Sequence, residues 1–169
     1  MQSPLHPMIV HLPMALAVLM PLLALGLLVA VQRAWLPAGV WALTVAAQAL
    51  LVGSGILALR TGEHEEDKVE GIVGDAILHQ HESAAQVFVA ASVAVLALAV
   101  VTWFLRRGRW APHAGLATAL GTVAVLALGY RVGKAGGEIV YGHGGAAAYA
   151  PTAPGQTPAP RSHRDDDDR

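Results

Sequence analysis

Four blocks of the sequence contain no charged residue and no histidine, and they constrain the fold more than any other feature. The blocks are 17 to 23 residues long and cover residues 12–31, 40–59, 83–105 and 114–130. A helix of about 20 residues, at 1.5 Å rise per residue, spans the roughly 30 Å hydrocarbon layer of a bilayer. The sequence therefore predicts an all-α integral membrane protein, a four-helix bundle with four transmembrane helices.

The composition agrees with a membrane location. Hydrophobic residues make up 54% of the 169 residues and charged residues only 14%, whereas a soluble domain has about 25% charged residues. The chain has no cysteine, which excludes disulfides, iron–sulfur clusters, thiolate metal sites and covalently attached haem. A formal net charge of −1 argues against nucleic acid binding.

The chain divides into one membrane domain, residues 1–145, and a disordered tail rich in Pro and Ala, residues 146–169. Pro13 and Pro21 lie inside the first span and are expected to interrupt its backbone hydrogen bonds one turn earlier. Between the second and third spans, apolar residues recur at helical spacing and predict a short amphipathic helix. These residues are Val69, Ile72, Val73, Ala76 and Ile77.

Basic residues in the short loops predict the orientation. Arg33 lies between the first and second spans, and Arg106, Arg107 and Arg109 lie between the third and fourth. Because cytoplasmic loops carry an excess of Lys and Arg, we expect both loops on the cytoplasmic side. Both termini and the longer second loop then lie on the outer, periplasmic side of the membrane.

Histidines gather at the outer end of the predicted bundle. Six of them fall at the outer ends of the spans or in outer segments: His6, His11, His64, His79, His81 and His143. None lies in mid-span, where Gln48 and Ser54 are the main polar residues, so we expect the buried part to be a scaffold. Three uses fit the outer group: ligands of a b-type haem or a metal ion, a proton relay, or a solvated polar surface.

The histidines differ as candidate ligands. His11 comes first because it lies about one turn inside the first span, where an unpaired polar group is costly. His6 points about 140° away from His11 on an ideal helix, so the two need not share a ligand. His81 could oppose His11, with Glu82 orienting one of its ring nitrogens.

Among these uses, a haem b would take His11 and His81 as its axial pair. His6 and His143 are further candidates for cofactor binding. The candidates for metal binding are His64, His79, Glu82 and Glu138. No residue is assigned a catalytic role.

Four separate motifs resemble a known bacterial membrane family, the one catalogued as domain of unknown function 2231. They are HPMIVHLP at residues 6–13, TGE at 61–63, HE at 81–82 and GGEIVYGHG at 136–144, and they occur in the order typical of that family. The resemblance implies a four-helix integral membrane domain. In that family the domain also occurs fused to Rieske-type or cytochrome c-type modules, which implies a redox setting and a haem b.

We predict a multi-pass protein of the bacterial inner membrane that binds haem b, or a metal ion, through outer-face histidines and acts in electron transfer. Its expected partners are the lipid bilayer and a periplasmic cytochrome c or Rieske-type redox protein, with a homo-oligomer as a further option. The alternative is a non-redox subunit that binds Zn or Cu, or a structural subunit of a membrane complex. An electron carrier or binding subunit fits better than a stand-alone enzyme.

Overall fold

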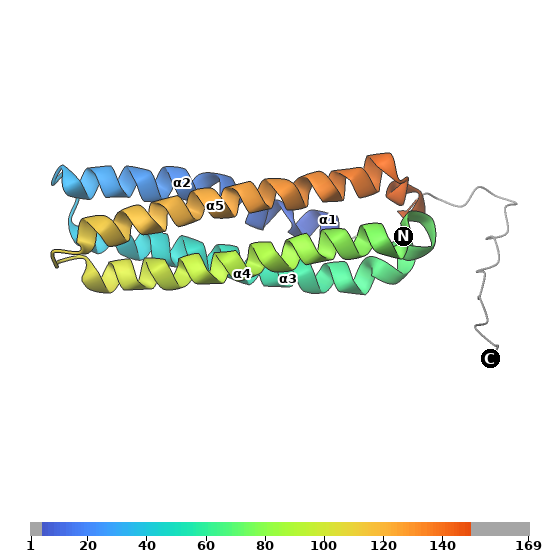
Figure 1. Ribbon diagram of the computed structural model, residues 1–169, viewed down its shortest axis with the longest axis horizontal. Helices are drawn as coiled ribbons and strands as arrows, with labels where there is room; N and C mark the ends of the chain where they lie inside the picture. Colours follow the sequence, from blue (N-terminus) through green and yellow to red (C-terminus); the bar gives the residue numbers. More distant parts are fainter. Residues whose placement is uncertain (1–4, 150–169) are drawn as a thin grey trace, which may run out of the picture.

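The computed structural model describes residues 5–149, in which four long helices run side by side as a bundle (Figure 1). They are α2 (His11–Gln32), α3 (Trp41–Val73), α4 (Asp75–Leu105) and α5 (Ala111–Gly137). Four short elements complete the described chain: α1 (Leu5–Ile9), η1 (Ala38–Val40), η2 (Glu138–Gly142) and η3 (Gly145–Tyr149). Residues 150–169, most of the expected tail, lie outside the described residues.

The surface of the bundle suits a bilayer. Four helical segments are long and apolar enough to cross a membrane, and large apolar side chains such as Leu22, Phe104 and Leu120 point outward and are 60–69% exposed. Soluble proteins rarely expose continuous apolar surface on this scale. The predicted four-helix membrane bundle is confirmed.

The interior combines an apolar cluster with buried polar side chains. The apolar cluster contains Ala17, Met20, Leu51, Phe88, Val95 and Val125. The Gln48 side-chain amide donates to the Ser92 carbonyl at 3.0 Å, which joins α3 to α4, and the buried Thr102 and Thr118 hydroxyls lie 2.8 Å apart, which joins α4 to α5. Interhelical hydrogen bonds and small residues hold helices together in lipid. The buried part of the spans therefore contains polar side chains, among them threonines, in addition to the Gln48 and Ser54 noted from the sequence.

A hairpin of two long helices replaces the amphipathic helix predicted between the second and third spans. α3 continues through the acidic segment to Val73, Gly74 interrupts the helix with a φ of 84°, and α4 begins at Asp75. The prediction of a separate helix was wrong because Glu and Lys favour continued helix, so the break comes only at the glycine. Val73 at the end of α3 and Leu78 at the start of α4 form a buried cluster with Ile139. Apolar residues of this segment are therefore buried, but they belong to two helices.

The first span is divided just before its first proline. α1 ends at Ile9 and α2 begins at His11. Pro13 has no N–H to donate to the Ile9 carbonyl, so the ladder is interrupted one turn before the proline. The short α1 packs mainly against α3, and this places His6 inside the group of helices.

Candidate functional site

His6 of α1 and His81 of α4 meet at the end of the bundle that carries the α3–α4 hairpin. Their ring centroids are 6.4 Å apart and their planes are nearly perpendicular, at 89°. Both side chains are half-buried. We call these two residues the histidine pair; it is the centre of the candidate site.

The His6 ring is held by the backbone of α3. Its Nδ1 lies 2.9 Å from the Ala58 carbonyl and 3.4 Å from the Thr61 hydroxyl. Because a carbonyl oxygen only accepts hydrogen bonds, Nδ1 carries the proton that it donates to Ala58. In the neutral ring, Nε2 then has a free lone pair, as a ligand nitrogen must.

Glu65 fixes the short helix that carries His6. Its Oε1 accepts the backbone N–H of Leu5 at 2.7 Å and lies 3.5 Å from the backbone nitrogen of His6. These amides belong to the first turn of α1, where N–H groups lack partners within the helix and favour a negative charge. The carboxylate therefore ties α1 to α3.

Each ring of the histidine pair packs against a glycine on a neighbouring helix. A Cβ atom added at Gly62 of α3 would lie 3.1 Å from Cε1 of His6, and one added at Gly136 of α5 would lie 3.2 Å from Cε1 of His81. Such contacts are tighter than nearly all real Cβ contacts. Glycine at both positions therefore lets the backbone approach the rings.

His81 carries a buried nitrogen that has no hydrogen-bond partner. Its Nδ1 is among the buried side-chain atoms left unpaired within residues 5–149. An unpaired buried polar atom costs free energy, and native proteins contain few of them. The ring also interacts with the backbone of Val132 on α5, so Nδ1 is the part of the His81 ring left without a well-formed hydrogen bond.

The structure brings His6, and not His11, to His81. Residues five positions apart already point about 140° from each other on a helix, and the side chain of His11 is exposed on the outside of the bundle. His6, a secondary candidate in the sequence, thus takes the position expected for His11.

The other predicted site residues lie on the surface with local partners. The exposed His64 pairs with the Arg60 carbonyl at 3.0 Å. His79, whose side chain is 80% exposed, lies 3.9 Å from the Glu82 carboxylate, which also accepts a hydrogen bond from Gln86 at 2.9 Å. Glu82 is thus directed to its own helix neighbours.

The segment after α5 places its two candidates outward. Glu138 forms an exposed ion pair with Lys134 at 3.6 Å, and the side chain of His143 is exposed. Among the described residues, no group of three or more His, Cys, Asp or Glu side chains is placed to hold a metal ion. The histidine pair stands alone in that part of the chain as a cluster of potential ligands inside the bundle.

The geometry gives each sequence motif a place at one site. HPMIVHLP contributes His6, TGE contributes Thr61 and Gly62, HE contributes His81, and the glycine-rich motif contributes Gly136. A family described as "Predicted membrane protein (DUF2231)" matches residues 2–148. The chain belongs to this family. No curated protein and no solved structure matches it, so the DUF2231 assignment establishes a membrane protein and leaves its chemistry to be argued from the site.

Sequence reasoning missed three residues that build the site in this DUF2231 protein. It considered the acidic and histidine positions of the motifs, but Gly62 and Gly136 are the residues that touch the rings. Glycines next to ligand-type residues within helical segments were the available signal, because glycine inside a helix is unfavourable without a packing reason. Glu65 gave no such signal, since it stands in a run of acidic residues.

Proposed function

We propose that this DUF2231 protein binds haem b through His6 and His81 and transfers electrons at one face of the membrane. The observation that carries the proposal is the meeting of two imidazoles from distant parts of the sequence, 6.4 Å apart inside the bundle. Paired imidazoles are a common ligand set for haem iron, which already holds four porphyrin nitrogens and has two axial positions.

The number of ligands favours haem over a bare metal ion. Structural Zn²⁺ sites use four protein ligands and catalytic ones use three. The described residues offer two imidazoles and no third His, Asp or Glu side chain placed to complete such a site. Two ligands are too few for zinc but can fill both axial positions of haem iron.

The surroundings of the two rings also fit the proposal. Ligand histidines usually donate their second ring N–H to a backbone carbonyl or carboxylate, which sets the tautomer and the ring orientation. Ala58 does this for His6 at 2.9 Å, and the Nδ1 of His81, which has no well-formed hydrogen bond, is the nitrogen of that ring that would be open to the iron. When bound, the haem supplies one-electron chemistry; Glu65 and Ala58 keep the His6 imidazole in place.

The proposal includes an orientation and a partner. The loops that contain Arg33, Arg106, Arg107 and Arg109 face the cytoplasm by the distribution of basic residues. The histidine pair, at the opposite end of the helices, then lies at the periplasmic face. There it would exchange electrons with a periplasmic cytochrome c or a Rieske-type protein.

Absorption spectra of the purified protein test the proposal. The protein is extracted in detergent, and spectra are recorded oxidised and after reduction with dithionite. We expect a Soret band that is lost in His6→Ala and in His81→Ala. His79→Ala and His11→Ala are matched controls on exposed side chains and should keep the band.

Each other outcome has a definite meaning. Colourless protein without iron contradicts haem binding. Zn or Cu found by elemental analysis without porphyrin supports the metal-binding alternative, and protein with neither supports a structural subunit. A band lost in His11→Ala but kept in His6→Ala would assign the axial pair to His11 and His81.

A further inference from the structure

The end of the bundle opposite the histidine pair carries positive charge without compensation. Its two connecting segments, residues 33–40 and 106–113, contain Arg33, Arg106, Arg107 and Arg109. No Asp or Glu occurs anywhere in residues 1–62 or 83–137. Within residues 5–149 these arginines therefore have no carboxylate partner in their own connecting segments or the adjoining spans, and an anion from outside the chain would complement them.

A small pocket is lined in part by two of these arginines. Its volume is about 230 Å³, and Gln32, Trp41, Arg106 and Arg107 are among its lining residues. The half-buried Arg106 is held in place: its guanidinium carbon lies 4.1 Å from the centre of the Trp103 ring, and Nη1 donates to the Trp103 carbonyl. A guanidinium fixed in this way is suited to bind phosphate oxygens.

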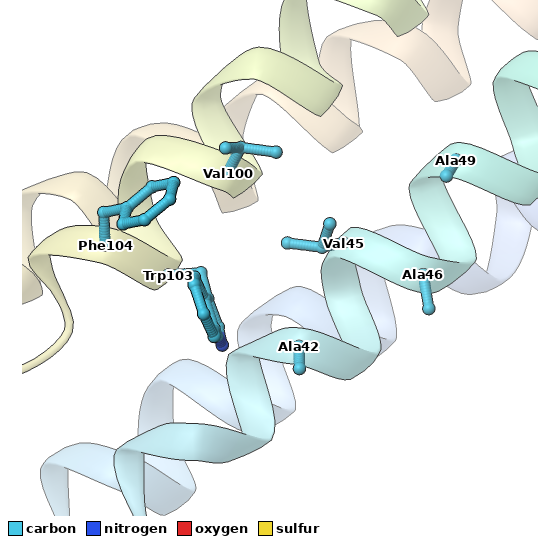
Figure 2. Close-up of a pocket in the computed structure, with 7 residues that line it drawn as sticks. All are labelled: Ala42, Val45, Ala46, Ala49, Val100, Trp103 and Phe104. Atoms are coloured by element: carbon cyan, nitrogen blue, oxygen red, sulfur yellow. The ribbon is translucent and has the colours of Figure 1, made fainter.

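An apolar groove lies near the same end of the bundle. It lies between α3 and α4, has a volume of about 430 Å³, and is lined by small residues of α3, including Ala46, and by Val100, Trp103 and Phe104 of α4 (Figure 2). Trp103 lines the groove and also stacks on Arg106, which lines the pocket, so this pair of side chains links the arginines to the groove. Figure 2 shows the Trp103 side chain pointing across toward α3.

The tryptophans set the depth of this arrangement in the membrane. All four tryptophans of the chain, Trp35, Trp41, Trp103 and Trp110, lie at or next to the arginine end. Tryptophan is enriched at the level of the lipid headgroups. The exposed Trp35 and Trp110 therefore place the arginine end at headgroup depth, and the groove residues of α3, from Ala42 to Ala49, extend from that end along the span.

We propose that this end of the bundle binds an anionic phospholipid, with the phosphate at Arg106 and Arg107 and one acyl chain in the groove between α3 and α4. The anionic headgroup of such a lipid would contact the arginines, and its apolar acyl chain would lie in the apolar groove. Basic pockets between transmembrane helices bind anionic lipid headgroups in other membrane proteins. The site is independent of the proposed haem, since it shares no residue with the histidine pair.

Native mass spectrometry of the delipidated protein tests the proposal. Phosphatidylglycerol and phosphatidylcholine with identical acyl chains are titrated, and the dissociation constants are compared. We expect phosphatidylglycerol to bind at least about tenfold more tightly. Because each arginine contributes about fivefold to the binding of anionic lipid, Arg106→Gln with Arg107→Gln should weaken phosphatidylglycerol binding about 25-fold.

Matched variants separate a built site from diffuse charge. Arg33→Gln with Arg109→Gln removes the same charge at the same end from residues outside the pocket and should weaken binding clearly less than the pocket pair, because these two arginines act only through the general charge of that end. Ala46→Phe fills the groove without a change of charge and should also weaken binding of phosphatidylglycerol. Inorganic phosphate, which has no acyl chain, should not compete.

Three results would overturn the proposal. Equal affinity for the two lipids would show that the lipid charge does not contribute to binding. These affinities are measured on the unaltered protein, so this test does not depend on the folding of any variant. An equal loss in the Arg33 and Arg109 control would show diffuse attraction only. Competition by inorganic phosphate, or unchanged binding in Ala46→Phe, would show an anion site without a lipid groove.

Discussion

The ring of His6 stands almost perpendicular to that of His81, with 6.4 Å between their centroids. The two residues come from α1 and α4, and a glycine of α3 or α5 lies against each ring. Four helical elements thus contribute to one small region at one end of the bundle. Such convergence of separate motifs is what distinguishes this region from the polar surface around it.

Gly136→Ala is expected to disturb the candidate site, whereas Gly137→Ala is not. The added methyl group at residue 136 would lie 3.2 Å from Cε1 of His81, while at residue 137 nothing lies within 4 Å. A change beside a ligand histidine typically costs tenfold or more in affinity, so we expect about tenfold weaker haem retention in Gly136→Ala. Haem titration of the two apoproteins measures it; equal affinities would show that the ring tolerates the methyl group.

Glu65→Gln should loosen α1. The carboxylate accepts the Leu5 N–H at 2.7 Å and lies beside the His6 amide, and a negative charge at a helix N-terminus contributes up to about 1 kcal/mol. We expect hydrogen exchange of the amides in residues 5–9 to become about fivefold faster. Glu63→Gln, on an exposed neighbouring residue, is the control, and equal exchange in both variants would rule out the anchoring role.

Gly115→Ala should destabilise the bundle. A Cβ there would lie 2.8 Å from Cδ1 of Leu28 and 2.9 Å from Cζ2 of the buried Trp41, so side chains must move, at a cost of about 1–3 kcal/mol. Gly53→Ala has nothing within 4 Å and should leave the free energy of unfolding unchanged or raise it. Unfolding in mixed detergent and dodecyl sulfate micelles gives both values, and a stability of Gly115→Ala equal to that of the unaltered protein would contradict the prediction.

The hydroxyl pair of α4 and α5 should show measurable coupling. Thr102 and Thr118 are buried with their oxygens 2.8 Å apart, and such interhelical bonds in membranes contribute about 0.6 kcal/mol. A double-mutant cycle with Thr102→Val and Thr118→Val should give a coupling energy of that size. Thr122 donates to the Ala119 carbonyl of its own helix, so a cycle between Thr102→Val and Thr122→Val should give a value near zero.

The sequence was sufficient for the bundle but not for the pairing within the site. Each uncharged block of membrane length predicts a span independently of the other helices. In the hydrocarbon layer all backbone polar groups must be paired within the protein, and a helix of about 20 residues achieves this. Which face of a span points inward depends on the other helices. The division before Pro13 changed the direction of α1, and only the packing of α1 on α3 decides that His6 reaches His81.

Helix ends were the other limit of the sequence. Of the residues in the apolar pattern near residue 72, Val73 becomes buried and Val69 and Ile77 pack against its cluster, whereas Ile72 is exposed. The pattern could not show that these residues belong to two long helices meeting at Gly74. The hydrophilic segment that follows the second span contains good helix formers, and from sequence it is compatible with a loop or with a continued helix. In the structure it continues α3, which packs against α4.

The placement of all four tryptophans at the arginine end gives the molecule a one-sided optical label. Intrinsic tryptophan emission will report the surroundings of one end of the bundle. The end with His6 and His81 has no native tryptophan and contributes nothing to this emission. A single tryptophan introduced near the histidine pair, in a variant whose native tryptophans are replaced, would therefore report on that end without background.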